Sequence, residues 1–315
     1  MSTPNAVPMS VVVISFNTRD KLETCLESVT TTRPVEIVVV DNGSTDGSIE
    51  LVREDFPHVR LLVNEENRGY GRAANQAVAA CATPAVLLLN SDTIVSPDSL
   101  VALGQYMAQH PRAAVVGPRL VNADGTLQRS TYGFPSAADT LLGETGLHLL
   151  VRRIPALRER FWRTWRHDRA RVVPWVLGAA LAMRRDAFDA VGGFDDAYFM
   201  YGEDVDLCRR LAAAGFETHY APVATVVHLS GQSTRTREGA MRRELLVSSR
   251  RYLGRHESRA TTARVLRTLR LIARARLVRD ALRLRLASQQ LDRDRLRASV
   301  DSWKAVLDER ALWKP

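Results

Sequence analysis

The chain has 315 residues, 45% of them hydrophobic, and a formal net charge of +9. This length and apolar content suffice for one large domain with a full core, or for a domain with an extension. No run of about 18 apolar residues predicts a transmembrane helix, and the first ten residues lack the basic and apolar regions of a secretory signal. Three widely spaced cysteines without C-x-x-C spacing indicate reduced packing residues of a cytoplasmic protein.

Charge is unevenly distributed along the chain. Residues 235–315 carry 22 Lys+Arg against 9 Asp+Glu, whereas residues 1–234 carry 22 against 26. A mildly acidic front part followed by a basic tail suggests different partners for the two parts. We therefore expect a domain over 1–234 and a basic amphipathic helical extension over 235–315.

Short apolar runs alternate with helical patterns in the front part. Strand, helix and strand recur at about 25-residue spacing, which is typical of parallel βαβ units. The sequence thus predicts an α/β fold with a mostly parallel sheet flanked by helices. The expected strands are 11–14, 36–40, 60–63, 86–89, 113–117 and 218–227, and the expected helices include 19–29, 48–55 and 97–109.

Polar residues follow the strand at 86–89. Asn90 and Asp92 come next, and they would lie on one side of the sheet if the strand continued through them. Ligands of open parallel sheets bind beyond the carboxyl ends of the strands, and a diphosphate-bound Mg²⁺ or Mn²⁺ takes one or two protein carboxylates. The simpler interpretation is an Asp-containing turn.

The stretch from Asn67 to Arg72 contains two glycines and two arginines. Gly69 and Gly71 permit close approach of the backbone to a ligand, and the following helix would present its amino end to an anion. Arg68 and Arg72 favour phosphate contact, although solvated arginines are equally compatible with the pattern.

Residues 119–172 are irregular and include a basic, aromatic run from Arg152 to Arg171. We interpret 119–172 as an ordered insertion or flap. Its arginines suggest a surface that meets anions, though a solvated helix face is the commoner meaning of such a run. The apolar segment 174–183 follows, with Gly178 where a bulky ligand could approach.

Acidic residues gather directly after Gly202. Glu203, Asp204 and Asp206 would lie in the first turn of a helix, where the helix dipole stabilises carboxylates. These carboxylates could act in catalysis, or they could only stabilise the amino end of the helix. His228, at the end of the last predicted strand, would reach the same edge of the sheet as Asp92.

The tail from about residue 237 has a helical pattern. One apolar stripe has the helical period and comprises Leu266, Leu269, Ala273, Leu277 and Leu284. The stripe could pack against the main domain, bind a partner helix, pair two subunits, or lie on an anionic membrane surface. Nucleic acid is not expected, because the tail has neither a zinc-finger pattern nor an aromatic stacking platform.

Six stretches together resemble one known family, the inverting family-2 glycosyltransferases with the GT-A fold. The resemblance extends to bacterial enzymes that elongate cell-surface polysaccharides, including rhamnosyltransferases. It covers roughly residues 9–232, in the family's order. The matching stretches are 11–17 (VVVISFN), 37–46 (IVVVDNGSTD), 67–75 (NRGYGRAAN), 89–93 (LNSDT), 192–195 (GGFD) and 202–206 (GEDVD).

The resemblance implies roles for individual residues. Asp92 corresponds to the metal-binding aspartate of the D-x-D motif, whose first position is Asn90 here, and His228 to a histidine that completes the metal site in some relatives. Asp204 corresponds to the catalytic base, with Glu203 as its rival. The implied nucleotide-sugar contacts are Ser15, Asn17, Asp41, Asn67, Arg68, Gly69, Arg72, Asn75, Asn90 and Ser91. The implied acceptor contacts are Trp175, Gly178, Ala179, Gly193, Phe194 and Asp195.

The implied reaction is metal-dependent, inverting transfer of a sugar from a nucleoside diphosphate, with Mg²⁺ or Mn²⁺ as cofactor. The donor would be dTDP-rhamnose or a UDP-hexose, and the acceptor a glycan or a polyprenyl-linked glycan at the inner membrane face. A sugar nucleotidyltransferase would use a similar strand-end aspartate and metal. A non-catalytic nucleotide-sugar-binding module would need neither the Asp92–His228 pair nor Asp204, and a basic scaffold protein is a further alternative.

Overall fold

The structure is a computed structural model that describes residues 6–151, 153–154, 162, 164–229, 238–287 and 289–314. It consists of two compact units. The first, here the sheet unit, contains residues 1–134, 166–199 and 203–230, and the second, here the helical unit, contains 135–165, 200–202 and 231–315. The predicted functional boundary near residue 234 stays a prediction. Residues 135–165 group with the C-terminal helices.

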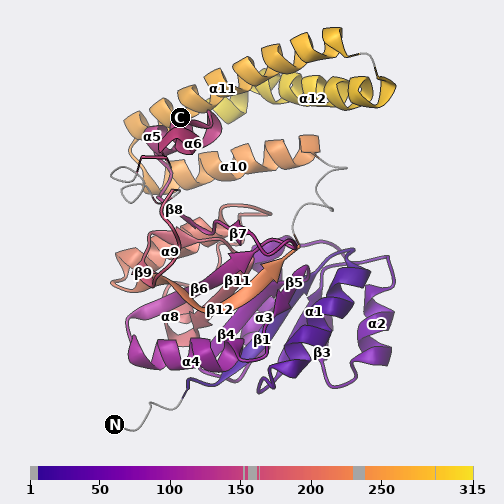
Figure 1. The fold of residues 1–315 in the computed structure, drawn as a ribbon, viewed down its shortest axis with the longest axis vertical. Helices are drawn as coiled ribbons and strands as arrows, with labels where there is room; N and C mark the ends of the chain where they lie inside the picture. Colours follow the sequence, from indigo (N-terminus) through magenta and orange to yellow (C-terminus); the bar gives the residue numbers. More distant parts are fainter. Residues whose placement is uncertain are drawn as a thin grey trace. The chain divides into compact units, whose positions relative to one another are not determined.

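The sheet unit is built on one large mixed sheet (Figure 1). Its strand order is β3-β2-β1-β4-β11-β6-β12-β5, with β7 and β9 at its margins. The strands β3, β2, β1 and β4 run parallel, as do β6 and β12, while β11 is antiparallel to both β4 and β6. The main strands are β1 (Met9–Ser15), β2 (Ile37–Asp41), β3 (Arg60–Val63), β4 (Ala85–Asn90), β5 (Thr93–Val95), β6 (Ala113–Val121), β11 (Ala180–Arg184) and β12 (Glu217–His228).

Helices cover both faces of this sheet because the central strands are apolar on both sides. Val11 and Val13 of β1 cluster with Leu22 and Leu26 of α1 on one face. The alternate residue Val12 is equally buried, and α3 lies against β1 and β2. The helices of the sheet unit are α1 (Arg19–Thr31), α2 (Ser48–Asp55), α3 (Tyr70–Ala80), α4 (Ser99–Gln109), α8 (Arg185–Ala190) and α9 (Glu203–Ala213).

Most predicted strands and helices are confirmed, with changes at their ends. The strand predicted at 86–89 ends at Asn90, and Ser91 and Asp92 form a turn before β5. Asp92 therefore lies in a turn and not on a continuation of this strand. Residues 119–172 contain short elements, namely β7 (Leu127–Gln128), β8 (Thr131–Tyr132), α5 (Ala137–Glu144), α6 (Leu147–Val151) and β9 (Arg171–Val172), while β10 (Trp175–Val176) pairs with β8. Much of the basic run from Arg152 to Arg171 lies outside the described residues.

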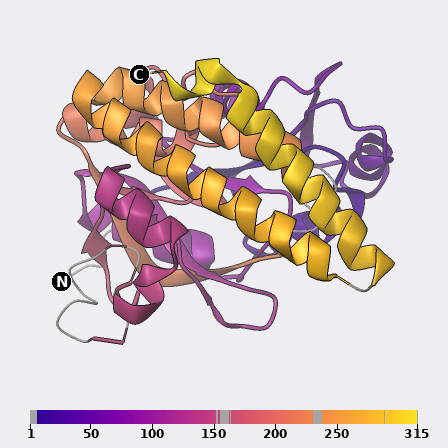
Figure 2. The same cartoon turned by 90° about the horizontal axis from the view of Figure 1, so that it is seen from above.

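The helical unit contains the three long C-terminal helices α10 (Glu238–His256), α11 (Arg259–Leu286) and α12 (Gln290–Asp308), followed by the short turn η2 (Arg310–Trp313). Helices α11 and α12 form an antiparallel pair, and α5 lies beside α11 (Figures 1 and 2). Leu246 of α10, Val306 of α12 and Leu312 form a small core to which Leu269 of α11 adds. Among the described helices, none is long and apolar enough to cross a bilayer.

Candidate active site

Two strand pairings join the elements that carry the predicted site. Ala180 of β11 lies opposite Leu89 of β4, and the backbone N–H of Asn90 donates to the carbonyl of Ala179 at 3.0 Å. On the far side, His228 of β12 pairs with Thr93 of β5. The turn containing Asp92 therefore lies between the end of β12 and the segment that precedes β11.

Asp92 and His228 are in direct contact. The distance from Asp92 Oδ1 to His228 Nε2 is 3.2 Å, and His228 Nδ1 lies 2.8 Å from Gln128 Oε1 of β7. Burial raises the pKa of Asp92, but the hydrogen bond and charge of His228 and the charge of Lys21 outweigh burial and hold the pKa below its ordinary value. Asp92 is therefore an anion at neutral pH.

The Asp92–His228 pair fits a divalent cation. When Nδ1 carries the proton that Gln128 accepts, Nε2 can act as a cation ligand beside the Asp92 carboxylate, whereas a doubly protonated ring donates to Asp92 instead. Ligands at adjacent corners of an octahedral Mg²⁺, each ~2.1 Å from the ion, are about 3 Å apart. No cluster of three or more His, Cys, Asp or Glu with metal-binding geometry occurs among the described residues.

Lys21 is a further charge beside Asp92 that sequence reasoning missed. Its Nζ lies 3.8 Å from Asp92 Oδ2 and is buried with no hydrogen-bond acceptor among the described residues. The available signal was its rarity, because the chain has only three lysines among 44 Lys+Arg. A buried ammonium group beside a strand end suits a phosphate oxygen.

Asp204, at the start of α9, is hydrogen-bonded to the segment that precedes β11. Its Oδ2 accepts from the backbone N–H of Gly178 at 3.0 Å, and its Oδ1 accepts from that of Val205 at 2.8 Å. Burial raises the pKa of Asp204 to about 6, although these two hydrogen bonds oppose the shift. Asp206 has a different environment, because it forms a buried ion pair with Arg210 at 2.7 Å.

Tyr70 links the two acidic centres and was also missed from the sequence. Its hydroxyl donates to the carbonyl of Gly178 at 3.0 Å. Burial raises the pKa of Tyr70 well above its ordinary value, and the charges of Glu203, Asp204 and Asp92 raise it further. All three carboxylates therefore act on one phenol. Its position between Gly69 and Gly71 in the quoted motif was the signal that could have identified it.

The carboxyl ends of β1 and β2 form a second polar cluster. Ser15 lies opposite Asp41 in the β1–β2 register, and Thr18 connects Ser15 to Ser91 through hydroxyl contacts of 3.1 and 2.7 Å. Asp41 is 1% exposed; its Oδ1 accepts from the Ser44 N–H, whereas its Oδ2 is buried with no hydrogen-bond partner in the described structure. A buried carboxylate oxygen without a donor indicates a place for a ligand donor.

Asparagines hold the loop that leads to α3. Asn42 donates to Asn67 Oδ1 at 2.9 Å and accepts from the Arg68 N–H at 3.1 Å, while Asn67 accepts from the Gly69 N–H at 3.0 Å. Asn17 binds the loop after β2 through the Thr45 N–H. Asn42 is an organising residue that sequence analysis did not single out. These contacts shape the loop, and direct donor contacts for Asn17 and Asn67 stay predictions.

The predicted acceptor residues lie in different surroundings, and only some of them adjoin the candidate site. Gly178 and Ala179 adjoin Asp204 and Asn90, as described, whereas Trp175 donates to the carbonyl of Gly133. Phe194 is 2% exposed and packs edge-on against Tyr70 and Phe188.

Asn75 and Arg72 hold the loop that contains Gly193 and Asp195. The Asn75 amide donates to the carbonyl of Phe194 and accepts from its N–H, both at 2.9 Å. Arg72 donates to the carbonyl of Asp196 at 3.1 Å. These side chains are thus engaged within the protein, and direct substrate contacts for them stay predictions.

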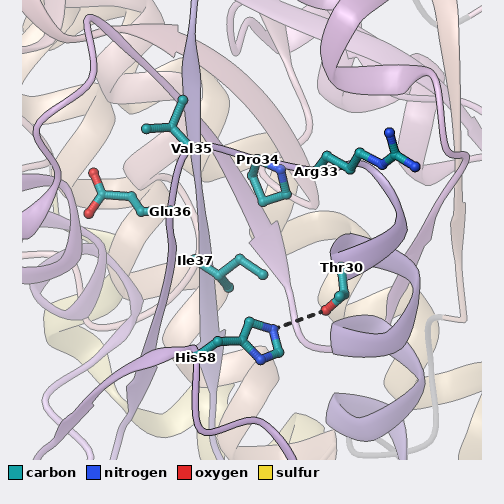
Figure 3. A pocket seen from close by; sticks show the side chains of 7 residues that line it. All are labelled: Thr30, Arg33, Pro34, Val35, Glu36, Ile37 and His58. Atoms are coloured by element: carbon teal, nitrogen blue, oxygen red, sulfur yellow. Dashed lines mark hydrogen bonds between the residues drawn. The ribbon is translucent and has the colours of Figure 1, made fainter.

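Figure 3 shows a pocket in the sheet unit that is lined by none of the candidate site residues. Arg33, Val35 and His58 line it, at the amino end of β2. Asp41 and the candidate site lie at the carboxyl end of the same strand.

The three cysteines are free and buried. Burial raises the pKa of the Cys25 and Cys208 thiols to about 12, so these thiols are protonated at neutral pH. This agrees with their predicted role as packing residues.

Comparisons with known proteins identify the family. Residues 4–246 match the family described as "Glycosyltransferase like family 2". An N-acetylglucosaminyl-diphospho-decaprenol L-rhamnosyltransferase of Mycobacterium tuberculosis is 36% identical over 244 residues, which are 72% of this chain and 77% of that protein. The rhamnosyltransferase WbbL of Escherichia coli is 28% identical over 78% of this chain and 92% of its own length.

A solved structure gives independent support for the fold. The mannosyltransferase PcManGT from Pyrobaculum calidifontis, in complex with GDP-Man and Mn²⁺, superposes with a TM-score of 0.57 and 17% identity. The match covers 98% of this chain and 89% of that one. The predicted GT-A fold is confirmed. The chain belongs to glycosyltransferase family 2 and is a glycosyltransferase.

Gly69 allows a specific prediction about the loop before α3. Its φ of +86° and ψ of +162° lie in a region that is essentially restricted to glycine, and a Cβ there would lie 2.5 Å from the carbonyl oxygen of Phe199. We expect Gly69→Ala to lower the free energy of unfolding of the sheet unit by more than ~2 kcal/mol.

Gly125→Ala is the matched control. Gly125 also has a positive φ, of +78°, but a Cβ there would meet nothing within 4 Å. We expect a loss of about 1 kcal/mol. Denaturant unfolding followed by tryptophan fluorescence would measure both variants, and equal losses would contradict the role given to the Phe199 contact.

Proposed function

We propose that the chain catalyses metal-dependent, inverting transfer of a sugar from a nucleoside diphosphate to a glycan acceptor. The observation that carries the proposal is that two carboxylates of opposite character, Asp92 and Asp204, both act on Tyr70 beside residues 178–179. Asp92 has a lowered pKa and contacts a histidine and a lysine. Asp204 has a raised pKa of about 6 and contacts only backbone N–H groups in the hydrogen bonds described above. Opposite shifts in neighbouring acids are the usual sign of divided catalytic roles.

The leaving-group side would be formed by Asp92, His228 and Lys21. Asp92 and His228 would hold Mg²⁺ or Mn²⁺, which when bound stabilises the negative charge that grows on a departing diphosphate. Gln128 would fix the tautomer of His228 by accepting from Nδ1–H, which would leave Nε2 available to hold the cation. The buried Lys21 ammonium group would bind a phosphate oxygen and offset the charge of Asp92.

The attacking side would be formed by Asp204. The N–H groups of Gly178 and Val205 fix its carboxylate, leaving a lone pair on each oxygen for the proton of an acceptor hydroxyl. A base with a pKa near the working pH combines a large ionised fraction with useful basicity. Attack from this side, opposite the diphosphate, inverts the anomeric carbon.

The nucleotide would occupy the ends of β1 and β2. The unpartnered Oδ2 of Asp41 would accept a hydrogen bond from the base or the ribose, with Ser15 adjacent to it. We propose a deoxythymidine-diphosphate rhamnose donor and a lipid-linked glycan acceptor, on the basis of the two rhamnosyltransferase relatives, one of which is named for a diphospho-decaprenol acceptor. A panel of donors, scored by the nucleoside diphosphate released, tests this choice. Release of pyrophosphate instead would indicate a nucleotidyltransferase.

Asp204→Asn tests the proposed base. The variant cannot accept the proton, so we expect it to retain donor binding by calorimetry and to lose about 10²–10⁴-fold in kcat. Because the carboxylate forms only above its pKa, the kcat of the unaltered enzyme should fall below a pH of about 6. Glu203→Gln is the matched control and should lose less activity and keep this acidic limb. A larger loss in Glu203→Gln than in Asp204→Asn would transfer the role to Glu203.

Asp92→Asn and His228→Gln test the proposed cation site. Each removes one ligand, so we expect the Mn²⁺ concentration for half-maximal activity, and the Kd for Mn²⁺ in the presence of nucleoside diphosphate, to rise at least about tenfold. Gln128→Leu should also raise the half-maximal Mn²⁺ concentration and the Kd for Mn²⁺, because the His228 ring would lose the hydrogen bond that orients it. Asp124→Asn, at a fully exposed turn residue, is the control. Unchanged Mn²⁺ binding in the first two variants would refute the site.

A further inference from the structure

Helix α11 carries two apolar stripes on opposite sides. The stripe seen in the sequence packs inside the helical unit, where Leu266 and Ala273 are 2% and 3% exposed. A second stripe faces outward. At 100° per residue its members fall within an arc of about 80°, nearly opposite the first, and they are Leu271, Ala275, Val278, Leu282 and Leu286.

The second stripe is exposed to an unusual degree. Leu271 is 64% exposed, Val278 58%, Leu282 53% and Leu286 85%. Aliphatic side chains scattered singly on a surface are ordinary, but a contiguous row of them marks an interaction surface. Sequence reading missed this row because two opposite stripes nearly cancel in the helical periodicity that reveals one.

Arginines border the stripe on both sides. The exposed side chains of Arg267, Arg274 and Arg285 lie along one border, and those of Arg279 and Arg283 lie along the other. Arg267, Arg274, Arg283 and Arg285 form no ion pair with any described residue. Their long side chains can hold the guanidinium groups at the level of lipid phosphates while the stripe enters the acyl region.

We propose that this outward face of α11 docks on an anionic lipid surface, with its axis in the membrane plane. An aliphatic row bordered on both sides by exposed arginines complements acyl chains and phosphates together. Nucleic acid would bind the arginines but would leave the aliphatic stripe exposed to water. An apolar groove of a protein would bury the stripe but would offer the arginines no anions. The inference does not depend on the proposed sugar transfer, because α11 lies in the helical unit and docking needs no substrate.

Vesicle co-sedimentation of the full chain tests the proposal, without donor or acceptor. The unaltered protein should bind vesicles of equal parts phosphatidylglycerol and phosphatidylcholine. It should bind much more weakly to vesicles of phosphatidylcholine alone. The combined variant L271S, V278S, L282S and L286S should lose at least about tenfold in partitioning. The combined variant R274Q, R283Q and R285Q should lose binding most strongly at low salt.

Two matched controls separate the α11 face from general effects. V63S, V101S and L245S change exposed aliphatic residues elsewhere, and R293Q, R295Q and R297Q remove three exposed arginines from α12. Both sets should retain most binding, and circular dichroism would verify that all variants are folded. Unchanged binding in the stripe variant would overturn the proposal. A dimer that becomes a monomer in that variant, with vesicle binding unaltered, would assign the face to a second copy of the chain.

Discussion

The pairing of β4 with β11 is the constraint on which the candidate site depends. Because β11 runs antiparallel between β4 and β6, the segment that precedes it lies at the carboxyl ends of the parallel strands, where the turn after β4 presents Asp92. The backbone of residues 178–179 forms hydrogen bonds with the elements of both carboxylates. Ala179 accepts from Asn90, which precedes the turn of Asp92, and Gly178 donates to Asp204. One short segment thereby holds the proposed cation-binding side and the proposed proton-accepting side together.

The two acids differ through their partners as well as their burial. Asp92 has partners that can carry positive charge, His228 and Lys21, and these overcome the desolvation of its carboxylate. Within the described part of the chain, Asp204 accepts hydrogen bonds from backbone N–H groups, which do not fully offset burial, and its pKa is about 6. The same side chain thus suits charge stabilisation in one place and proton transfer in the other. The comparisons establish the family, and this contrast supports the roles we propose within it.

Much of the fold could be predicted because its signals are local. The runs before Ser15, Asp41 and Asn90 are apolar on both faces, as buried parallel strands must be, and their polar ends meet at one edge of the sheet. Lys21, Tyr70 and Gln128 could not be placed in the same way. Their importance arises from contacts with Asp92, Gly178 and His228 that are 71, 108 and 100 positions away in the chain, and no periodicity encodes such contacts. The outward stripe of α11 was not predicted for a different reason. The apolar stripe on the opposite side of the helix nearly cancels its contribution to the helical periodicity.

The central claim is that Asp92 and His228 share one cation beside a bound diphosphate. The most direct measurement is anomalous diffraction from crystals grown with Mn²⁺ and a nucleoside diphosphate. The account predicts a manganese peak within about 2.3 Å of both Asp92 Oδ1 and His228 Nε2, with a phosphate oxygen among the remaining ligands. A manganese peak bound by other side chains, or a diphosphate bound with Asp92 and His228 still in contact only with each other, would contradict it.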